Sequence, residues 1–285
     1  MRDVEAPGPA DPEAAWQDRA VPDRAASPGR GASAPSTTVT LFGYSFHTGS
    51  APAIVAAVAA HHAVGPRTIV TANVDHIVQL AEDADFRDAY ARAAARTLDG
   101  MPLVWLARAA SGRPAERITG HDLLACVLAD PPPFARRVFF VAARQDAADT
   151  LTTRLQAAGL PDGAVASAVP PFGFEDDASY GRALAERIRT HGTTLLVMGV
   201  GAPKSEIWVD RQGRALGNPV VFCVGEALSV AAGYVPRAPW LMQRLGLEWV
   251  FRFLCAPRRL FRRYFIESWR FIGIAARDRA SGRRD

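Results

Sequence analysis

Short, almost uninterrupted apolar runs alternate with longer helix-like segments between residues 38 and 224, and this alternation constrains the fold more than any other feature. Apolar runs that lack alternating polar positions are typical of strands covered on both faces. Strands are predicted at 39–42, 68–72, 137–142, 164–169, 194–199 and 219–224. Helices are predicted at 51–62, 75–95, 120–128, 146–158, 178–191 and 204–216. We therefore expect an α/β fold with a mostly parallel sheet and helices on both of its faces.

The two ends of the chain differ from this central part. Residues 1–36 are rich in Pro, Ala, Gly and Ser with few large apolar side chains, so they are predicted to be disordered. Residues 37–233 form the predicted α/β domain, and residues 234–285 form a basic appendage. No stretch approaches the roughly 18 to 20 apolar residues that span a bilayer, and the first residues lack a signal-peptide core. We therefore expect a cytoplasmic protein.

Cysteine and acidic residues show no metal or disulfide pattern. Cys126, Cys223 and Cys255 are far apart, lie in apolar surroundings and form no CxxC pair, so we expect core residues of a reducing compartment. No cluster of Asp, Glu or His has metal-ligand spacing, and Asp176 or Asp177 is expected to cap the following helix. No metal and no other cofactor is predicted.

Positive charge is concentrated in the appendage. Residues 234–285 hold 12 Arg against 4 acidic residues, whereas residues 1–233 hold 21 basic against 25 acidic residues. On a helical wheel, one side of the appendage holds Phe261, Tyr264, Phe265, Ser268, Trp269 and Ile272, and the other holds Arg259, Arg263, Arg270 and Arg277. This pattern favours a helix on an anionic membrane surface; the alternative is a helix docked on the core. Nucleic acid is not predicted as a partner, because the aromatic residues form an apolar stripe rather than stacking platforms.

Polar residues and glycines follow directly after several predicted strands. In open parallel α/β sheets, ligands bind beyond the carboxyl ends of the strands. Segments 73–76, 99–102 and 199–204 occupy such positions. Asp99 lies in a Leu-Asp-Gly-Met-Pro turn, where it either only shapes the backbone or acts as a catalyst.

The motif GVGAPKSE, residues 199–206, opens a predicted helix. Its glycines let the backbone approach a ligand, and a helix N-terminus next to Lys204, the only lysine of the chain, favours an anion such as a phosphate. A plain strand-to-helix turn accounts for the same residues.

The motifs TANVDH and RITGHD each allow two interpretations. Thr71, Asn73 and Asp75 either bind the hydroxyls of a sugar or ribose, or include the cap of the next helix. His76 is either a general base or a structural residue. Arg117 either binds a carboxylate or phosphate, or pairs with a nearby acid.

Taken together, these motifs resemble the WecG/TagA/CpsF family of bacterial glycosyltransferases. The resemblance runs from about Val39 to Tyr264 and rests on the order and spacing of the motifs. These are TANVDH, LDGMPLV followed by RITGHDLL, GVGAPKSEIW, VGEALSVAAGYVPRAPWL and GLEWVFRFLCAPRRLFRRY. The resemblance implies a Rossmann-like fold of the glycosyltransferase E type. It further implies a metal-independent, inverting transfer from a nucleotide sugar, usually a UDP-sugar, to a polyprenyl-diphosphate-linked sugar at the cytoplasmic membrane face.

The resemblance also implies roles for individual residues. Asp99 aligns with the proposed general base of the family. The substrate-binding residues expected from the loops and from the resemblance are Thr71, Asn73, Arg117, Gly199, Gly201, Lys204, Glu206, Arg237, Arg252 and Arg259. The arginines of the appendage are expected to close over the diphosphate, and the appendage is expected to bring the enzyme to its lipid-linked acceptor.

Two departures from the family pattern bear on specificity. Ser205 stands where the family usually has Gln, and Gly225–Ser229 lacks the Asp of a Gly-x-Phe-Asp pattern. These departures keep a second hypothesis open, a non-catalytic nucleotide- or lipid-binding protein tethered to the membrane, and hydrolysis of a lipid-linked sugar is a third. Homo-oligomer formation and the identity of both sugars are also left open.

Overall fold

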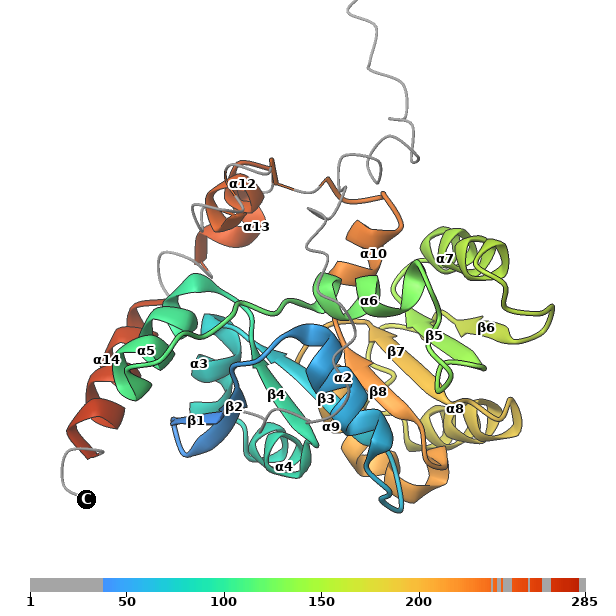
Figure 1. The fold of residues 1–285 in the computed structure, drawn as a ribbon, viewed down its shortest axis with the longest axis horizontal. Coiled ribbons are helices and arrows are strands. Elements are labelled where there is room, and N and C mark those ends of the chain that lie inside the picture. The colour runs from blue at the N-terminus through green and yellow to red at the C-terminus, as the bar shows by residue number, and fades with distance from the viewer. Residues whose placement is uncertain are drawn as a thin grey trace, which may run out of the picture. The chain divides into compact units, whose positions relative to one another are not determined.

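A six-stranded sheet forms the centre of the computed structural model, which describes residues 38–236, 238–239, 242, 248–255, 257–262 and 268–281. Its order is β4-β3-β8-β7-β5-β6, and every neighbouring pair is parallel (Figure 1). The strands are β3 (Arg67–Ala72), β4 (Ala95–Leu98), β5 (Val138–Ala142), β6 (Val165–Ala168), β7 (Leu195–Gly199) and β8 (Val220–Cys223). The predicted α/β fold is confirmed. The predicted disorder of residues 1–36 lies outside the described residues.

Helices follow the strands along the chain. They are α2 (Ala51–Ala60), α3 (Val74–Glu82), α4 (Ala84–Arg92), α5 (Met101–Ser111), α6 (Gly120–Leu128), α7 (Gln145–Ala157), α8 (Ala178–Thr190), α9 (Lys204–Gln212), the 3₁₀ helix η1 (Gly213–Leu216), α10 (Ala227–Ala231), α12 (Glu248–Cys255), α13 (Pro257–Arg262) and α14 (Ser268–Ser281). Before them, β1 (Thr38–Leu41) and β2 (Tyr44–His47) form a separate antiparallel hairpin.

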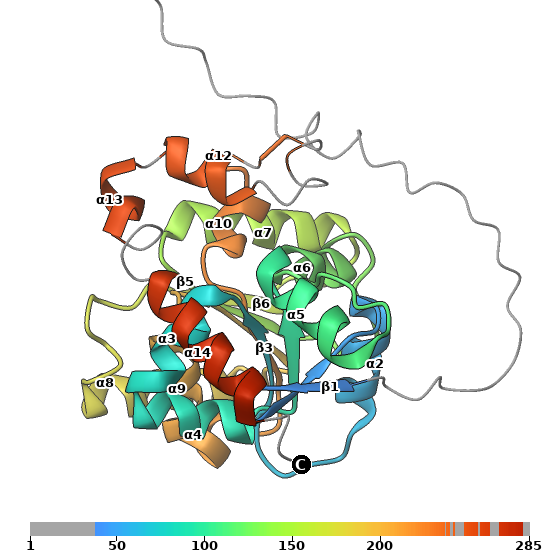
Figure 2. The same cartoon turned by 90° about the vertical axis from the view of Figure 1, so that its left-hand side faces the viewer.

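The sheet is covered on both faces. Every residue of β5, β7 and β8 is buried, although successive side chains of a strand point to opposite faces. Helices α3, α4, α9 and α8 contact one another in that order, and a second series is formed by α2, α6 and α7. Figure 2 shows α3, α4 and α9 on one side of the sheet and α5 and α6 on the other. Continuous apolar strands are therefore the signature of two-sided burial here.

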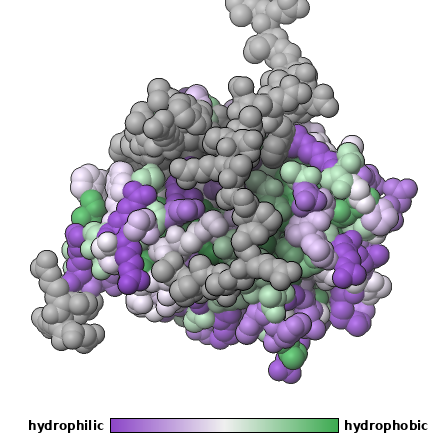
Figure 3. Space-filling model, in the orientation of Figure 1, coloured by the Kyte–Doolittle hydropathy of each residue, from purple (hydrophilic) through white to green (hydrophobic). Residues whose placement is uncertain are grey.

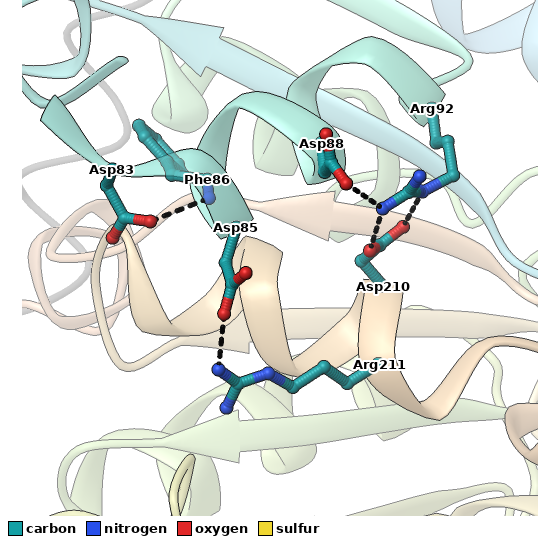
Figure 4. A network of polar contacts seen from close by, with 7 residues as sticks. All are labelled: Asp83, Asp85, Phe86, Asp88, Arg92, Asp210 and Arg211. Carbon is teal, nitrogen blue, oxygen red and sulfur yellow. Dashed lines mark hydrogen bonds and ion pairs between the residues drawn. The ribbon is translucent and has the colours of Figure 1, made fainter. Parts of the chain in front are cut away.

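Helix α9 is tied to α4 by charged side chains (Figure 4). The guanidinium of Arg92 donates to both carboxylate oxygens of Asp210 at 2.6 and 2.7 Å, and Arg211 donates to Asp85 at 2.7 Å. The hydrogen bonds to Asp210 raise the pKa of Arg92, which stays charged. Since these pairs are largely exposed, each contributes at most about 1 kcal/mol to the free energy of folding. Their main effect is to fix how α4 and α9 are aligned with each other.

Helix α14 packs against α3 and the hairpin turn, a contact that we call the α14 seam and define by Phe42, Glu82, Arg270, Phe271 and Asp278. Phe42 has a φ of 54°, which side-chain-bearing residues rarely adopt. Its N–H donates to Asp278 Oδ1 at 2.9 Å, and its ring lies 6.1 Å from that of Phe271, centroid to centroid. Arg270 pairs with Glu82. Contacts from α14 thus offset the conformational free energy that the positive φ of Phe42 costs.

The appendage also contains α12 and α13, which lie apart from the α14 seam. In both views, α12 and α13 lie beyond the same end of the strands as α10, the helix that follows β8 (Figures 1 and 2). Leu254 and Phe261 are exposed there, as are Trp269 and Ile272 on α14. No helix in the described part of the chain is long and apolar enough to cross a membrane. Figure 3 shows strongly hydrophilic residues at the left and right of the visible face, next to paler and hydrophobic ones.

Several predicted elements differ from the structure. The predicted strand 39–42 belongs to the hairpin and not to the parallel sheet. The predicted helix 75–95 is broken at Asp83, whose carboxylate accepts the N–H of Phe86 at 3.0 Å and so starts a second helix. The predicted helix 204–216 ends at Gln212 and continues as the 3₁₀ helix. Strand β4 lies outside the predicted strand ranges, because its four residues include Arg96 and Thr97, although the position of the turn at Asp99 implies a strand before it.

Two smaller expectations have mixed outcomes. Cys223 is buried, as expected, but Cys126 is only partly buried and Cys255 is exposed, so the prediction of three core cysteines is wrong. Asp177 caps α8, its carboxylate accepting the N–H groups of Ser179 and Tyr180, which confirms the predicted cap.

Candidate active site

Asp99 lies at the carboxyl end of β4, between this strand and α5. Its N–H donates to the carbonyl of Ala72 at 2.6 Å, which holds the ends of β4 and β3 together. Gly100 has a φ of 126°, a conformation that other residues rarely adopt, so glycine is needed for the chain to turn into α5. Asp99 is partly exposed, as a group that meets a substrate at this edge must be.

Asn73 follows β3 and caps α3. Its Oδ1 accepts the N–H of His76 at 3.1 Å, so the predicted cap is formed. The hydroxyl of Thr71 is buried and donates to the carbonyl of Cys223 at 3.4 Å. His76 is buried, and its Nδ1 lies 2.7 Å from the hydroxyl of Tyr90, which supports the structural interpretation of this histidine. The substrate-binding roles of Thr71 and Asn73 stay predictions.

The loop between β7 and α9 depends on glycine for two reasons. A Cβ at Gly199 would lie 2.6 Å from Leu228 Cδ1, so only glycine allows α10 to pack on the end of β7. Gly201 has a φ of 89°. Lys204 opens α9, and its Nζ lies 5.5 Å from the ring centroid of Phe172, an almost fully exposed side chain. The loop thus presents one lysine and the start of a helix at the carboxyl end of β7.

The loop after β8 lies against its neighbours on both sides. The N–H groups of Val224 and Gly225 donate to the carbonyl of Met198 in β7, at 3.1 and 3.2 Å. A Cβ at Gly225 would lie 3.5 Å from the Cα of Gly201, and a Cβ at Gly120 would lie 2.8 Å from Val224 Cβ. The start of α6 and the loops after β7 and β8 therefore meet.

Arg117 lies in the segment that leads into α6. The next residue, Ile118, donates its N–H to the carbonyl of Leu98 at 2.9 Å and accepts the hydroxyl of Thr97 at 3.1 Å. This segment therefore runs beside the end of β4, directly before Asp99. We call residues 73, 99–100, 117–120, 199–204 and 224–226 together the carboxyl edge, since backbone contacts join all of these segments.

Glu206 differs from the other predicted site residues because it is buried, with only 3% of its surface exposed. Its Oε2 has no hydrogen-bond partner among the described residues, and burial raises its pKa to about 8. It lines a cavity of about 390 Å³ together with Thr68 of β3, Arg92 of α4 and Asp210 of α9. The predicted contact between Glu206 and a nucleotide stays a prediction, and the packing makes Glu206 part of the interior.

Three predicted arginines cannot be placed in this site. Arg237 lies outside the described residues. Arg252 belongs to α12 and Arg259 to α13, and the structure describes only the backbone of these two residues. Their roles at the diphosphate stay predictions.

The comparison with known families agrees with this geometry. The model of the glycosyl transferase WecG/TagA/CpsF family matches residues 39–285, which is most of the chain. The chain belongs to this family. The match extends beyond Tyr264, where the sequence resemblance ends, and so includes α14. Family membership implies a glycosyltransferase of cell-surface polysaccharide biosynthesis with a Rossmann-like α/β fold.

Metal chemistry is not decided by these observations. Among the described residues, no three His, Cys, Asp or Glu side chains gather in a way that could hold a metal ion. Metal-independent transfer by this glycosyltransferase stays a prediction.

Two residues near the carboxyl edge carry no sequence signal. Tyr90 lies within the predicted helix 75–95, where an aromatic side chain predicts only packing in the hydrophobic core. Phe172 follows two prolines and precedes a glycine, which indicates a turn but not an exposed ring beside Lys204. Only the fold brings either residue close to the predicted site.

Proposed function

We propose that this glycosyltransferase moves a sugar from a UDP-sugar to a polyprenyl-diphosphate-linked sugar, with inversion and without a metal ion. The observation that carries this proposal is that Asn73, Asp99 and the β7–α9 loop all belong to the carboxyl edge of the sheet. Ligands of open parallel sheets bind at this edge. Family membership supplies the reaction class.

In the proposed step, Asp99 is the general base. An acceptor hydroxyl loses its proton to the Asp99 carboxylate while its oxygen bonds to the anomeric carbon of the donor. The bond from that carbon to UDP breaks on the opposite face, and UDP leaves with the electron pair. General-base catalysis of this kind is worth about 10² to 10⁴ in rate. The partly exposed position of Asp99 at the end of β4 supports this role.

The negative charge that develops on UDP needs fixed positive partners. Lys204 and the N–H groups at the start of α9 lie at the carboxyl edge and suit this task. We propose that Arg237, Arg252 and Arg259 of the appendage add to them, and that Arg117 contacts the substrate from the side of β4. Such donors act on charge formed in the transition state without a metal ion.

The acceptor is proposed to reach the site from a membrane. The appendage holds 12 Arg against 4 acidic residues, which favours an anionic lipid surface. Leu254 on α12 and Phe261 on α13 are exposed and offer apolar contact to lipid. We propose peripheral association with the inner face of the cytoplasmic membrane, through these helices.

The deciding experiment is a UDP-release assay with UDP-sugars and short-chain polyprenyl-diphosphate sugars, run with and without EDTA. We expect release that requires the acceptor and survives EDTA, and a product of inverted anomeric configuration by NMR. UDP binding without turnover on the panel would favour a nucleotide-binding protein instead, and release without an acceptor would favour a hydrolase.

The role of Lys204 is tested in the same assay. Lys204→Met keeps much of the side-chain length but removes the charge, and we expect turnover to fall about 10²-fold. Arg182→Met, on the exposed face of α8, is the matched control and should leave turnover within twofold. Equal effects of the two variants would remove Lys204 from the mechanism.

A further inference from the structure

A buried pair of polar side chains lies beneath the carboxyl edge. Tyr90 of α4 is fully buried, yet its hydroxyl lies 2.7 Å from Nδ1 of His76, which is also buried. The Tyr90 ring packs edge-on against Phe86 at 4.9 Å and against Tyr44 at 5.9 Å, centroid to centroid. Because packing fixes the Tyr90 ring, its hydroxyl is held in one position beside the His76 ring.

His76 in turn is joined to Asn73. The His76 N–H donates to Asn73 Oδ1 at 3.1 Å, and the carbonyl of Ala72, the residue before Asn73, accepts the Asp99 N–H at 2.6 Å. Tyr90 therefore contacts the ring of His76, Asn73 contacts the backbone N–H of the same residue, and the peptide bond between Asn73 and Ala72 leads on to the Asp99 N–H.

The surroundings of Tyr90 keep its phenol neutral. Burial raises the pKa of Tyr90 well above its usual value, and Glu206, Cys223 and Asp99 each raise it further, while Arg96 lowers it. The phenol therefore stays neutral, and whether it donates to or accepts from the His76 ring follows from the histidine tautomer. The carboxylate of Asp99 acts on Tyr90 although the two belong to different elements.

We propose that Tyr90 is a positioning residue for the transfer reaction, acting through His76 to fix the side chain of Asn73 beside Asp99. This inference rests on the proposed function. Without the Tyr90 hydroxyl, the His76 ring loses this hydrogen bond, and the first turn of α3 gains freedom at the point where Asn73 is proposed to meet the substrate. Small displacements of a positioned group lower the rate of the chemical step more than they lower ground-state binding.

The first test compares Tyr90→Phe with Tyr44→Phe in the transfer assay. Tyr90→Phe keeps the packed ring and removes only the hydroxyl, and we expect kcat to fall about tenfold with KM for the donor within twofold. Tyr44→Phe removes a hydroxyl from the ring that packs against Tyr90 and should leave both constants unchanged. A kcat of Tyr90→Phe equal to that of the wild type would overturn the proposal.

A double-mutant cycle asks whether Tyr90 acts through Asn73. Asn73→Ala removes the proposed contact, so adding Tyr90→Phe to it should lower kcat by less than twofold further. Independent losses that multiply in the double variant would overturn the proposed route.

A final measurement does not depend on turnover. Hydrogen exchange of the His76 N–H reports the bond to Asn73, and we expect Tyr90→Phe to raise its exchange rate about tenfold while Tyr44→Phe leaves it unchanged. If the wild type transfers no sugar, the proposed function fails, and this rate still decides whether Tyr90 fixes Asn73. An unchanged rate in Tyr90→Phe would overturn the positioning role even in an active enzyme.

Discussion

The carboxyl edge and the α14 seam both join segments that are distant in the sequence, but they do so by different means. At the edge, backbone hydrogen bonds and glycines bring the chain together, as at Asp99 and Gly225, and side chains are left partly exposed. At the seam, side chains make the contact, through the rings of Phe42 and Phe271 and through two charged groups of α14.

This difference predicts which substitutions affect catalytic activity and which affect the free energy of unfolding. Because backbone contacts hold the edge together, substitutions of its partly exposed side chains should alter activity more than stability. Side chains that close the seam are already engaged, so substitutions there should alter stability more than activity.

The largest effect is expected from Asp99→Asn at the edge. Asn suits the turn as well as Asp does, so the free energy of unfolding should stay within about 0.5 kcal/mol of the wild type. Loss of the base should lower kcat by about 10² to 10⁴. Asp130→Asn, at an exposed position between α6 and β5, is the control for a change of charge. Full turnover of Asp99→Asn would return Asp99 to the role of a turn residue.

The reverse pattern is expected from Phe271→Ala at the seam. Phe271 is 9% exposed and supports the turn at Phe42, so its loss should cost about 3 kcal/mol in urea unfolding or in local opening of α14. Affinity for UDP should stay within twofold. Trp269→Ala, on the same helix but 69% exposed, should cost less than about 0.5 kcal/mol. Equal costs at the two positions would show that α14 is not docked in solution.

Sequence patterns predict the edge better than the seam, for a physical reason. Apolar strands and the polar residues that follow them are local features, so the sheet, the cap at Asn73 and the turn at Asp99 can be read from short segments. The docking of α14 depends on Phe42, more than 200 residues away, and on a positive φ that no propensity favours there. The helical wheel shows an apolar face but not what covers it.

Glu206 shows the same limit of prediction just beyond the carboxyl edge. The motif GVGAPKSE places it three residues into the helix that begins at the edge, and only the packing of α9 on the sheet reveals that its carboxyl is buried. Tyr90 likewise becomes notable only when α4 brings its hydroxyl to His76.

Burial of Glu206 predicts a pH dependence of stability. Its pKa in the folded chain is about 8, against about 4.5 when exposed, so the folded state binds the additional proton between these values. Stability should therefore be highest below about pH 4.5 as far as this group is concerned, and should fall by up to about 1.4 kcal/mol per pH unit until about pH 8. Glu206→Gln should remove this component in urea unfolding series. A variant with the slope of the wild type would mean that Glu206 is not the group that titrates.

The smallest effect is expected on α12 and α13, where Leu254 and Phe261 are exposed. Leu254 is 67% and Phe261 53% exposed, and partial burial of each in lipid would contribute about 1 kcal/mol. The double variant Leu254→Ser, Phe261→Ser should therefore weaken binding to phosphatidylglycerol-containing vesicles about 30-fold. Val64→Ser is the matched control, because Val64 is 74% exposed but precedes β3 at the opposite edge of the sheet. If Val64→Ser weakened binding equally, adsorption would be unspecific. If Trp269→Ser weakened binding more than the double variant, α14 rather than α12 and α13 would be the helix that meets the membrane.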